Sequence, residues 1–157
     1  MRRLVSTLFA LAALAAPLTA QTHTDFSGKW ALDPKSIENG MGPTSMTLTV
    51  TQDSKTIKIE SAASSQMGDM KSAIVLNTDG SESKNSVTGP AGALELVSTG
   101  KWEGPVFVVT TKTEFQGNPM TQNERWTLGT DGKTLTLERS ATIMGQTQSL
   151  KMLFNKQ

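Results

Sequence analysis

The side chains best suited to chemistry are the acidic Glu124 and the basic Arg139. Alternation places them on one face of two neighbouring predicted strands. An ion pair inside a protein is costly unless it is well hydrogen-bonded, so an inward pair requires an explanation. One interpretation is a partly wet ion pair that fixes strand register. The other makes Arg139 the anchor for a ligand carboxylate or another polar head, with Glu124 as its counter-ion when no ligand is bound.

Other residues offer little for catalysis. His23 is the only histidine and cysteine is absent, so neither a nucleophilic triad nor a histidine metal cluster can be assembled. Nothing in the spacing of the carboxylates marks an acid–base pair, and the glycines lie singly in turns rather than in phosphate-binding loops. We therefore predict a protein that is not an enzyme and has no cofactor and no metal site.

A minor alternative is copper binding by methionine. Met67 and Met70 flank a predicted turn, with Met41, Met46 and His23 as further candidate ligands, and thioethers select Cu(I). Methionine is also an adaptable filler of apolar gaps, and this second interpretation makes the same residues part of the barrel's packing.

The elements that must hold these residues are β-strands. Period-two alternation, interrupted by turn residues about every ten positions, predicts an all-β single antiparallel up-and-down β-barrel (a meander) of about 8–10 strands. Between the first two strands, Asp33-Pro34 predicts a short helix or loop. The predicted strands are 25–32, 45–52, 55–63, 71–78, 81–88, 93–102, 105–116, 119–129, 133–143 and 147–155.

Turn signals predict the register of the last strands. Asp131-Gly132 at a turn centre pairs Leu128 with Leu135, Trp126 with Leu137, Arg125 with Glu138 and Glu124 with Arg139. Centring the neighbouring turns on Gly117-Asn118 and Gly145-Gln146 aligns Thr111, Glu124, Arg139 and Met152 at one level, and places Thr113 and Gln122 beside them. This arrangement predicts a polar belt inside an apolar shell. A hairpin at Asp79-Gly80 would place Ser83 and Asn85 on the inward face as well.

Bulky aromatic residues complete the predicted interior, because Trp30 and Trp126 also alternate inward. The residues expected to line a ligand-binding lumen are Arg139, Glu124, Thr111, Thr113, Gln122, Trp126, Met152, Val109 and Trp30.

The amino-terminal end reads as an export signal. Arg2 and Arg3 precede a short apolar run and a small residue at position 20, which predicts a signal peptide over 1–20 and one domain over 21–157. No later segment is apolar enough to span a membrane as a helix, and without cysteine there is no lipid anchor or disulfide. Loss of the two arginines changes the net charge from +1 to −1, which argues against a nucleic-acid partner. We expect an exported, periplasmic or extracellular monomer.

The opening strand, with Phe26 followed by Gly28-x-Trp30, resembles the first strand of the calycins, the lipocalins and fatty-acid-binding proteins. The resemblance implies a barrel that encloses a small apolar ligand. In lipocalins a basic side chain from the last barrel strand crosses this tryptophan, a part that Arg139 would take here. The chain departs from both families, since it has no tyrosine and reads Arg139-Ser140-Ala141 where fatty-acid-binding proteins have Arg-x-Tyr.

Together these features predict an exported barrel that binds a hydrophobic or amphipathic small molecule without catalysis. The alternative is an envelope structural or protein-interaction module of the same fold with a filled interior. An internal cavity of roughly 300 Å³ or more favours the carrier, and a fully packed lumen favours the module.

Overall fold

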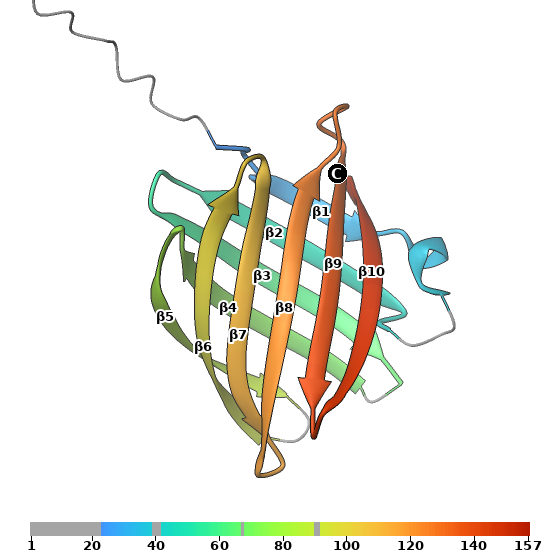
Figure 1. Cartoon of the computed structure of the whole chain (residues 1–157). Helices are drawn as coiled ribbons and strands as arrows, with labels where there is room; N and C mark the ends of the chain where they lie inside the picture. Colours follow the sequence, from blue (N-terminus) through green and yellow to red (C-terminus); the bar gives the residue numbers. More distant parts are fainter. Residues whose placement is uncertain (1–22, 39–41, 67, 90–91) are drawn as a thin grey trace, which may run out of the picture.

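The computed structural model describes residues 23–38, 42–66, 68–89 and 92–157, and the predicted signal peptide lies outside these ranges. Ten antiparallel strands within them form one sheet that curves into a barrel (Figure 1). The predicted all-β up-and-down barrel is thereby confirmed. The strands are β1 (Gly28–Leu32), β2 (Ser45–Gln52), β3 (Thr56–Ser65), β4 (Gly68–Asn77), β5 (Asp79–Gly89), β6 (Gly92–Glu103), β7 (Val106–Phe115), β8 (Asn118–Leu128), β9 (Thr134–Ile143) and β10 (Gln146–Lys156).

A short helical turn, η1 (Pro34–Ser36), lies between β1 and β2. The Asp33 carboxylate caps it by accepting a hydrogen bond from the Lys35 backbone N–H, and proline occupies the first helical position, where no amide proton is needed. The predicted short helix is confirmed. None of the helices in the described ranges is long and apolar enough to cross a membrane.

Strand β1 closes the barrel by pairing with both β2 and β10. Trp30 lies opposite Lys156, whose Nζ sits 5.2 Å from the centre of the indole ring. Gly28 leaves room for this contact, since a Cβ there would lie 2.8 Å from Cε of Lys156 and the glycine φ is +139°. Lys156, and not Arg139, therefore crosses Trp30, because β9 is not a neighbour of β1.

The segment that precedes β1 fills one end of the barrel. Phe26 is fully buried there, and its carbonyl accepts a 2.9 Å hydrogen bond from Nε1 of Trp30. The ring of Trp102 stacks on both His23 and Phe26, with centroid separations of 4.6 and 5.6 Å. His23 is thus held against an aromatic ring, and this end of the lumen is packed.

The register predicted for β8 and β9 is confirmed at all four pairs, but the side chain of Arg125 bonds Glu103 at 3.0 Å rather than Glu138. The β7–β8 and β9–β10 registers were predicted wrongly, each by two residues. Their turns centre on Gln116-Gly117 and Met144-Gly145, where both residues have positive φ, as a type I′ hairpin requires. Since the shift is even, every side chain keeps its predicted face.

Two turns at the packed end of the barrel are stabilised in the same way, by an aspartate side chain. Asp53 and Asp131 each accept backbone hydrogen bonds from the residues two and three positions later, and each also bonds the hydroxyl of a threonine, Thr56 or Thr134. These backbone amides hold the pKa of both carboxyl groups below the ordinary value of 3.8. Each aspartate lies two residues before one copy of a short sequence repeat, which spans Lys55–Glu60 and Lys133–Glu138.

Strands β4 and β5 are the two edges of the sheet, so the hairpin predicted at Asp79-Gly80 forms no backbone ladder. Side chains join the edges instead. The Asn85 amide accepts from the Val75 N–H at 2.8 Å and donates to the Val75 carbonyl at 3.0 Å, and Ser83 Oγ accepts from the Asn77 N–H at 2.7 Å. We predicted that Ser83 and Asn85 would make the lumen polar. That prediction was wrong, because both side chains bond the β4 backbone instead.

Replacing Asp53 and Asp131 by asparagine should reduce the amount by which the free energy of unfolding falls at low pH. A carboxyl group whose pKa is lowered in the folded state contributes stability that is present above its unfolded pKa and lost as pH falls through the folded value. Urea denaturation between about pH 6 and pH 2 should show a smaller loss for the double variant than for the wild-type chain. Equal losses would contradict this assignment.

Asn85→Ala should loosen the junction between β4 and β5. Two hydrogen bonds to the Val75 backbone are lost, and we expect the free energy of unfolding to fall by about 1–2 kcal/mol. Hydrogen exchange at the Val75 amide should accelerate, whereas Asn155→Ala, at an exposed position of β10, should leave that amide unchanged. Unaltered exchange at Val75 in Asn85→Ala would show that the side chain does not hold the edges together.

Candidate functional site

The interior beyond the packed end contains a cavity of about 600 Å³. Side chains from β2 to β10 line it, because alternate residues of each strand point inward. Most of them are aliphatic or methionine, and the apolar lining includes Ile59, Ile74, Leu94, Leu96 and Leu137. The lumen is therefore packed at one end and open beyond it, and the cavity of about 600 Å³ exceeds the volume of roughly 300 Å³ that favours a carrier.

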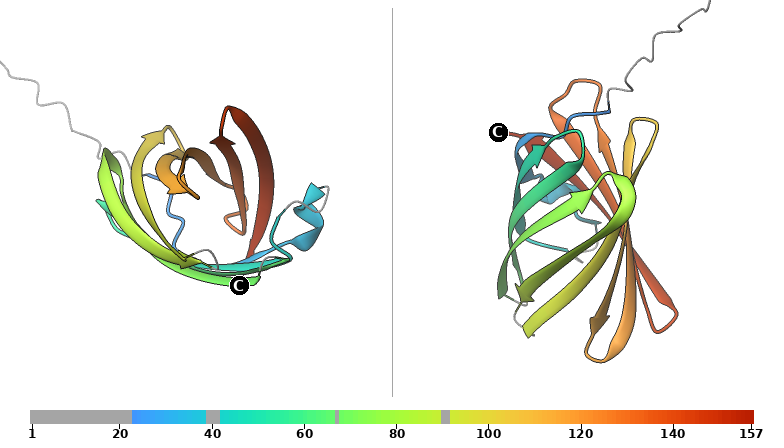
Figure 2. Two further views of the ribbon diagram at one scale, coloured as in Figure 1. Left: turned by 90° about the horizontal axis from the view of Figure 1, so that it is seen from below. Right: turned by 90° about the vertical axis from the view of Figure 1, so that its left-hand side faces the viewer.

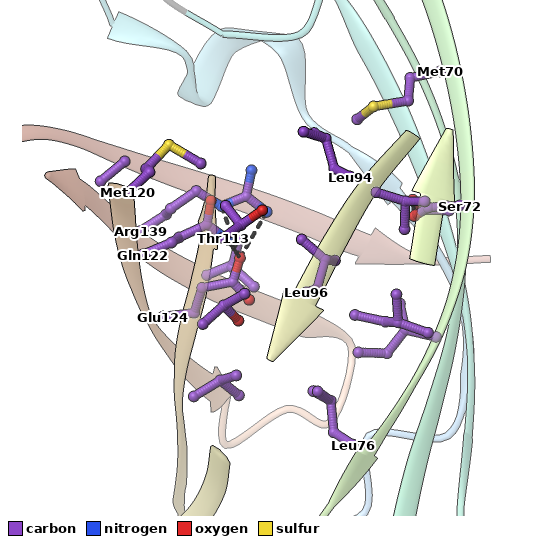
Figure 3. A pocket seen from close by; sticks show the side chains of 18 of the residues that line it. Met70, Ser72, Leu76, Leu94, Leu96, Thr113, Met120, Gln122, Glu124 and Arg139 are labelled. Atoms are coloured by element: carbon purple, nitrogen blue, oxygen red, sulfur yellow. Dashed lines mark hydrogen bonds and ion pairs between the residues drawn. The ribbon is translucent and has the colours of Figure 1, made fainter. Parts of the chain in front are cut away.

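A polar cluster stands on one wall of this cavity (Figure 3). Oε1 of Glu124 accepts hydrogen bonds from Nε of Arg139 and Nε2 of Gln122, both at 2.8 Å, and an ion pair joins it to Nη2 of Arg139, also at 2.8 Å. Oε2 accepts from the indole Nε1 of Trp126 at 3.0 Å. Glu124 is buried and Arg139 is about one-third exposed, with relative side-chain exposures of 10% and 31%.

The strands explain why these four residues meet. Gln122, Glu124 and Trp126 are alternate inward residues of β8, and the β8–β9 register brings Arg139 directly opposite Glu124. Figure 3 shows Gln122, Glu124 and Arg139 gathered on one side of the cavity, with Met70 and Ser72 of β4 on the other. The charged pair therefore stands on one wall of a largely apolar chamber, and the hydroxyl groups of Ser61 and Ser72, which share a 2.8 Å hydrogen bond, line the cavity from β3 and β4.

The two predicted threonines belong to the same wall but have other partners. Thr111 shares a 2.8 Å hydrogen bond with the Ser98 hydroxyl, and Thr113 donates to the Glu95 carbonyl at 2.7 Å. Both bonds lead to β6 rather than to Glu124. The predicted polar belt exists, but its hydroxyl groups are paired separately from the charged pair.

Seven of the nine predicted lumen residues line the cavity: Arg139, Glu124, Thr111, Thr113, Gln122, Trp126 and Val109. Met152 and Trp30 do not. Met152 is fully buried opposite Leu137, because the two-residue shift of the last hairpin sets Leu150 opposite Arg139. Trp30 is packed at the closed end beneath Lys156.

Sequence reasoning missed the contribution of the early strands and β6. Period-two alternation alone would have found these positions, had the inward face of each strand been assigned. The omitted lining residues of these strands are Met46, Leu48, Ile59, Ser61, Met70, Ser72, Leu94 and Leu96.

The candidate copper ligands whose positions are described do not lie together. Met41 and Met67 lie outside the described residues, Met46 and Met70 line the cavity, and His23 stacks on Trp102 at the packed end. In the described part of the chain, no group of three or more histidine, cysteine, aspartate or glutamate residues is placed to hold a metal ion.

Comparisons with known proteins bear mainly on the fold. No protein-family model and no curated protein matches the chain. Among solved structures, the chain is similar to a zebrafish ileal bile acid-binding protein complexed with cholic acid, with 13% sequence identity and a TM-score of 0.49 over 84% of this chain and 98% of that chain. The strand order decides the architecture: the fold is a ten-stranded antiparallel up-and-down β-barrel in which β1 pairs with β10. This is the kind of barrel that the resemblance to calycins implied.

The charged pair inside this barrel should contribute more to the free energy of unfolding than an exposed pair does. Arg139→Met leaves the buried Glu124 carboxylate without its cation, and we expect the free energy of unfolding to fall by about 1–3 kcal/mol. The double variant Glu124→Gln/Arg139→Met should lose less, because no charge remains unpaired. Urea denaturation followed by tryptophan fluorescence measures both.

Arg125→Met is the matched control, since Arg125 lies next to Glu124 on β8 but pairs with the exposed Glu103 of β6 on the outer face. Its effect should be far smaller. Equal losses for the Arg125 and Arg139 variants would show that burial does not strengthen the inner pair.

Proposed function

We propose that this protein is an exported, non-catalytic carrier of a small hydrophobic or amphipathic molecule. The observation that carries the proposal is the cavity of about 600 Å³, which combines a mainly apolar lining with the hydrogen-bonded cluster around Glu124 and Arg139. Ligand pockets of roughly 300–1,000 Å³ commonly have this composition, in which apolar walls supply affinity and a few polar groups fix orientation.

The position of the polar cluster supports the same function. Arg139 keeps about one-third of its side chain exposed while its partner Glu124 is buried, so the guanidinium is the accessible member of the pair. An apolar molecule that enters the chamber would place its polar head against this wall and its hydrocarbon part against Leu94, Leu96 and Ile74. A filled-interior module would not leave this volume open.

Export is part of the proposal and is supported by the amino-terminal sequence. Arg2 and Arg3, the apolar run and the small residue at position 20 fit a leader that directs the chain to a periplasm or the extracellular space. There the carrier would act as a monomer without a cofactor.

Filling the cavity should abolish binding. Ala141 lines the cavity from β9, and Ala141→Trp would place an indole in the space that the ligand needs. Titration with N-phenyl-1-naphthylamine, an uncharged probe that fluoresces in apolar surroundings, should show binding to the wild-type chain and about tenfold or greater loss in Ala141→Trp.

Ser140→Trp is the matched control, because the neighbouring position on β9 points to the outer face. It should bind the probe like the wild-type chain. Absence of probe binding by the wild-type chain, or equal loss in both variants, would contradict the carrier function.

A further inference from the structure

The polar cluster is already neutral and well bonded. The Glu124 carboxylate receives hydrogen bonds from Arg139, Gln122 and Trp126 on its two oxygens. These donors occupy most of the roughly four lone-pair positions that a carboxylate offers. The side chain of Glu124 is also only 10% exposed, so loss of these bonds would leave an unpaired carboxylate in the interior.

No spare charge is available to a ligand elsewhere in the cavity. Among the described residues that line it, Glu124 and Arg139 are the only charged ones, and each compensates the other at 2.8 Å. An anionic head that approaches Arg139 would also approach the Glu124 carboxylate, which is a like charge in an apolar chamber. A cationic head would meet an anion that Arg139 already neutralises. The site therefore penalises either sign of net charge.

Hydrogen-bonding capacity remains for an uncharged head. The guanidinium has five N–H groups, and its bonds to the described residues use only Nε and Nη2. Gln122 donates to Glu124 through Nε2, and its carbonyl oxygen has no hydrogen bond to the described residues. A donor and an acceptor thus stand side by side at the cavity wall, as a hydroxyl or carbonyl group requires.

We propose that the natural ligand is an uncharged apolar molecule with one hydroxyl or carbonyl head, such as a long-chain alcohol, and not a carboxylate. This inference rests on the proposed carrier function and specifies its ligand class. In it Glu124 is the specificity-determining residue, because it cancels the charge by which Arg139 would otherwise attract an anion.

Competition between ligands of matched chain length tests the assignment. Dodecanol, dodecanamide and dodecanoate would each displace N-phenyl-1-naphthylamine from the wild-type chain at about pH 8, where a carboxylic acid is ionised. We expect dodecanol or dodecanamide to compete at about tenfold lower concentration than dodecanoate. Failure of the probe to bind would overturn the carrier function itself, whereas stronger competition by dodecanoate would overturn only the ligand class.

Glu124→Gln should remove the preference for the uncharged ligands. The variant keeps the shape of the side chain but leaves Arg139 uncompensated, so dodecanoate should compete about tenfold better than with the wild-type chain. Glu138→Gln makes the same change of net charge on the exposed outer face of β9 and should leave the order unchanged. An unaltered order in a folded Glu124→Gln variant, checked by circular dichroism, would refute the role of Glu124; if that variant does not fold, the wild-type series alone decides.

Discussion

The structure depends on the pairing of the short strand β1 with both β2 and β10. Only three residue pairs join β1 to β10, from Trp30 opposite Lys156 to Leu32 opposite Phe154. These pairs unite the beginning and the end of the meander, so they convert a curved sheet into a barrel. The packing of Phe26 and Trp30 beneath them adds apolar burial to a ladder too short to be stable alone.

Closure at β1 moves the remaining sheet edges to β4 and β5, on the other side of the barrel. Backbone groups at an edge need partners, and here Asn85 and Ser83 supply them with side-chain atoms. The barrel is consequently joined by a backbone ladder between β1 and β10 and by side-chain hydrogen bonds between β4 and β5. Figure 2 shows how the strands curve around the interior. The junction between β4 and β5 is the part of the wall with the least backbone support.

The interior divides according to the same closure. Aromatic residues fill the end where the segment before β1 enters, and the cavity occupies the rest. A carboxylate within such a chamber must be neutralised nearby, and Glu124 meets this requirement through Arg139, Gln122 and Trp126. Because Lys156 covers Trp30, Arg139 is not needed at the closed end and remains at the cavity wall.

Much of the candidate site could be predicted because strands alternate their side chains and a turn with Asp131-Gly132 has few alternative centres. This turn alone placed Glu124 opposite Arg139 and Trp126 opposite Leu137. The predicted registers at the two neighbouring turns were wrong by two residues. The reason is that Gln116 and Met144 adopt a positive φ, which these residue types seldom take. An even shift left the inward face correct and changed only which inward residues are level, so Met152 was placed beside Arg139 wrongly.

The sequence by itself determined the strand pattern, the inward faces of β7 to β10 and the Glu124–Arg139 pair, because all three follow from local alternation and from turn signals. Only the tertiary structure decided where the barrel closes, that Lys156 covers Trp30, and that about 600 Å³ of the interior stays open. These features depend on contacts between residues far apart in the chain and on how side chains share a common volume. No local pattern contains that information.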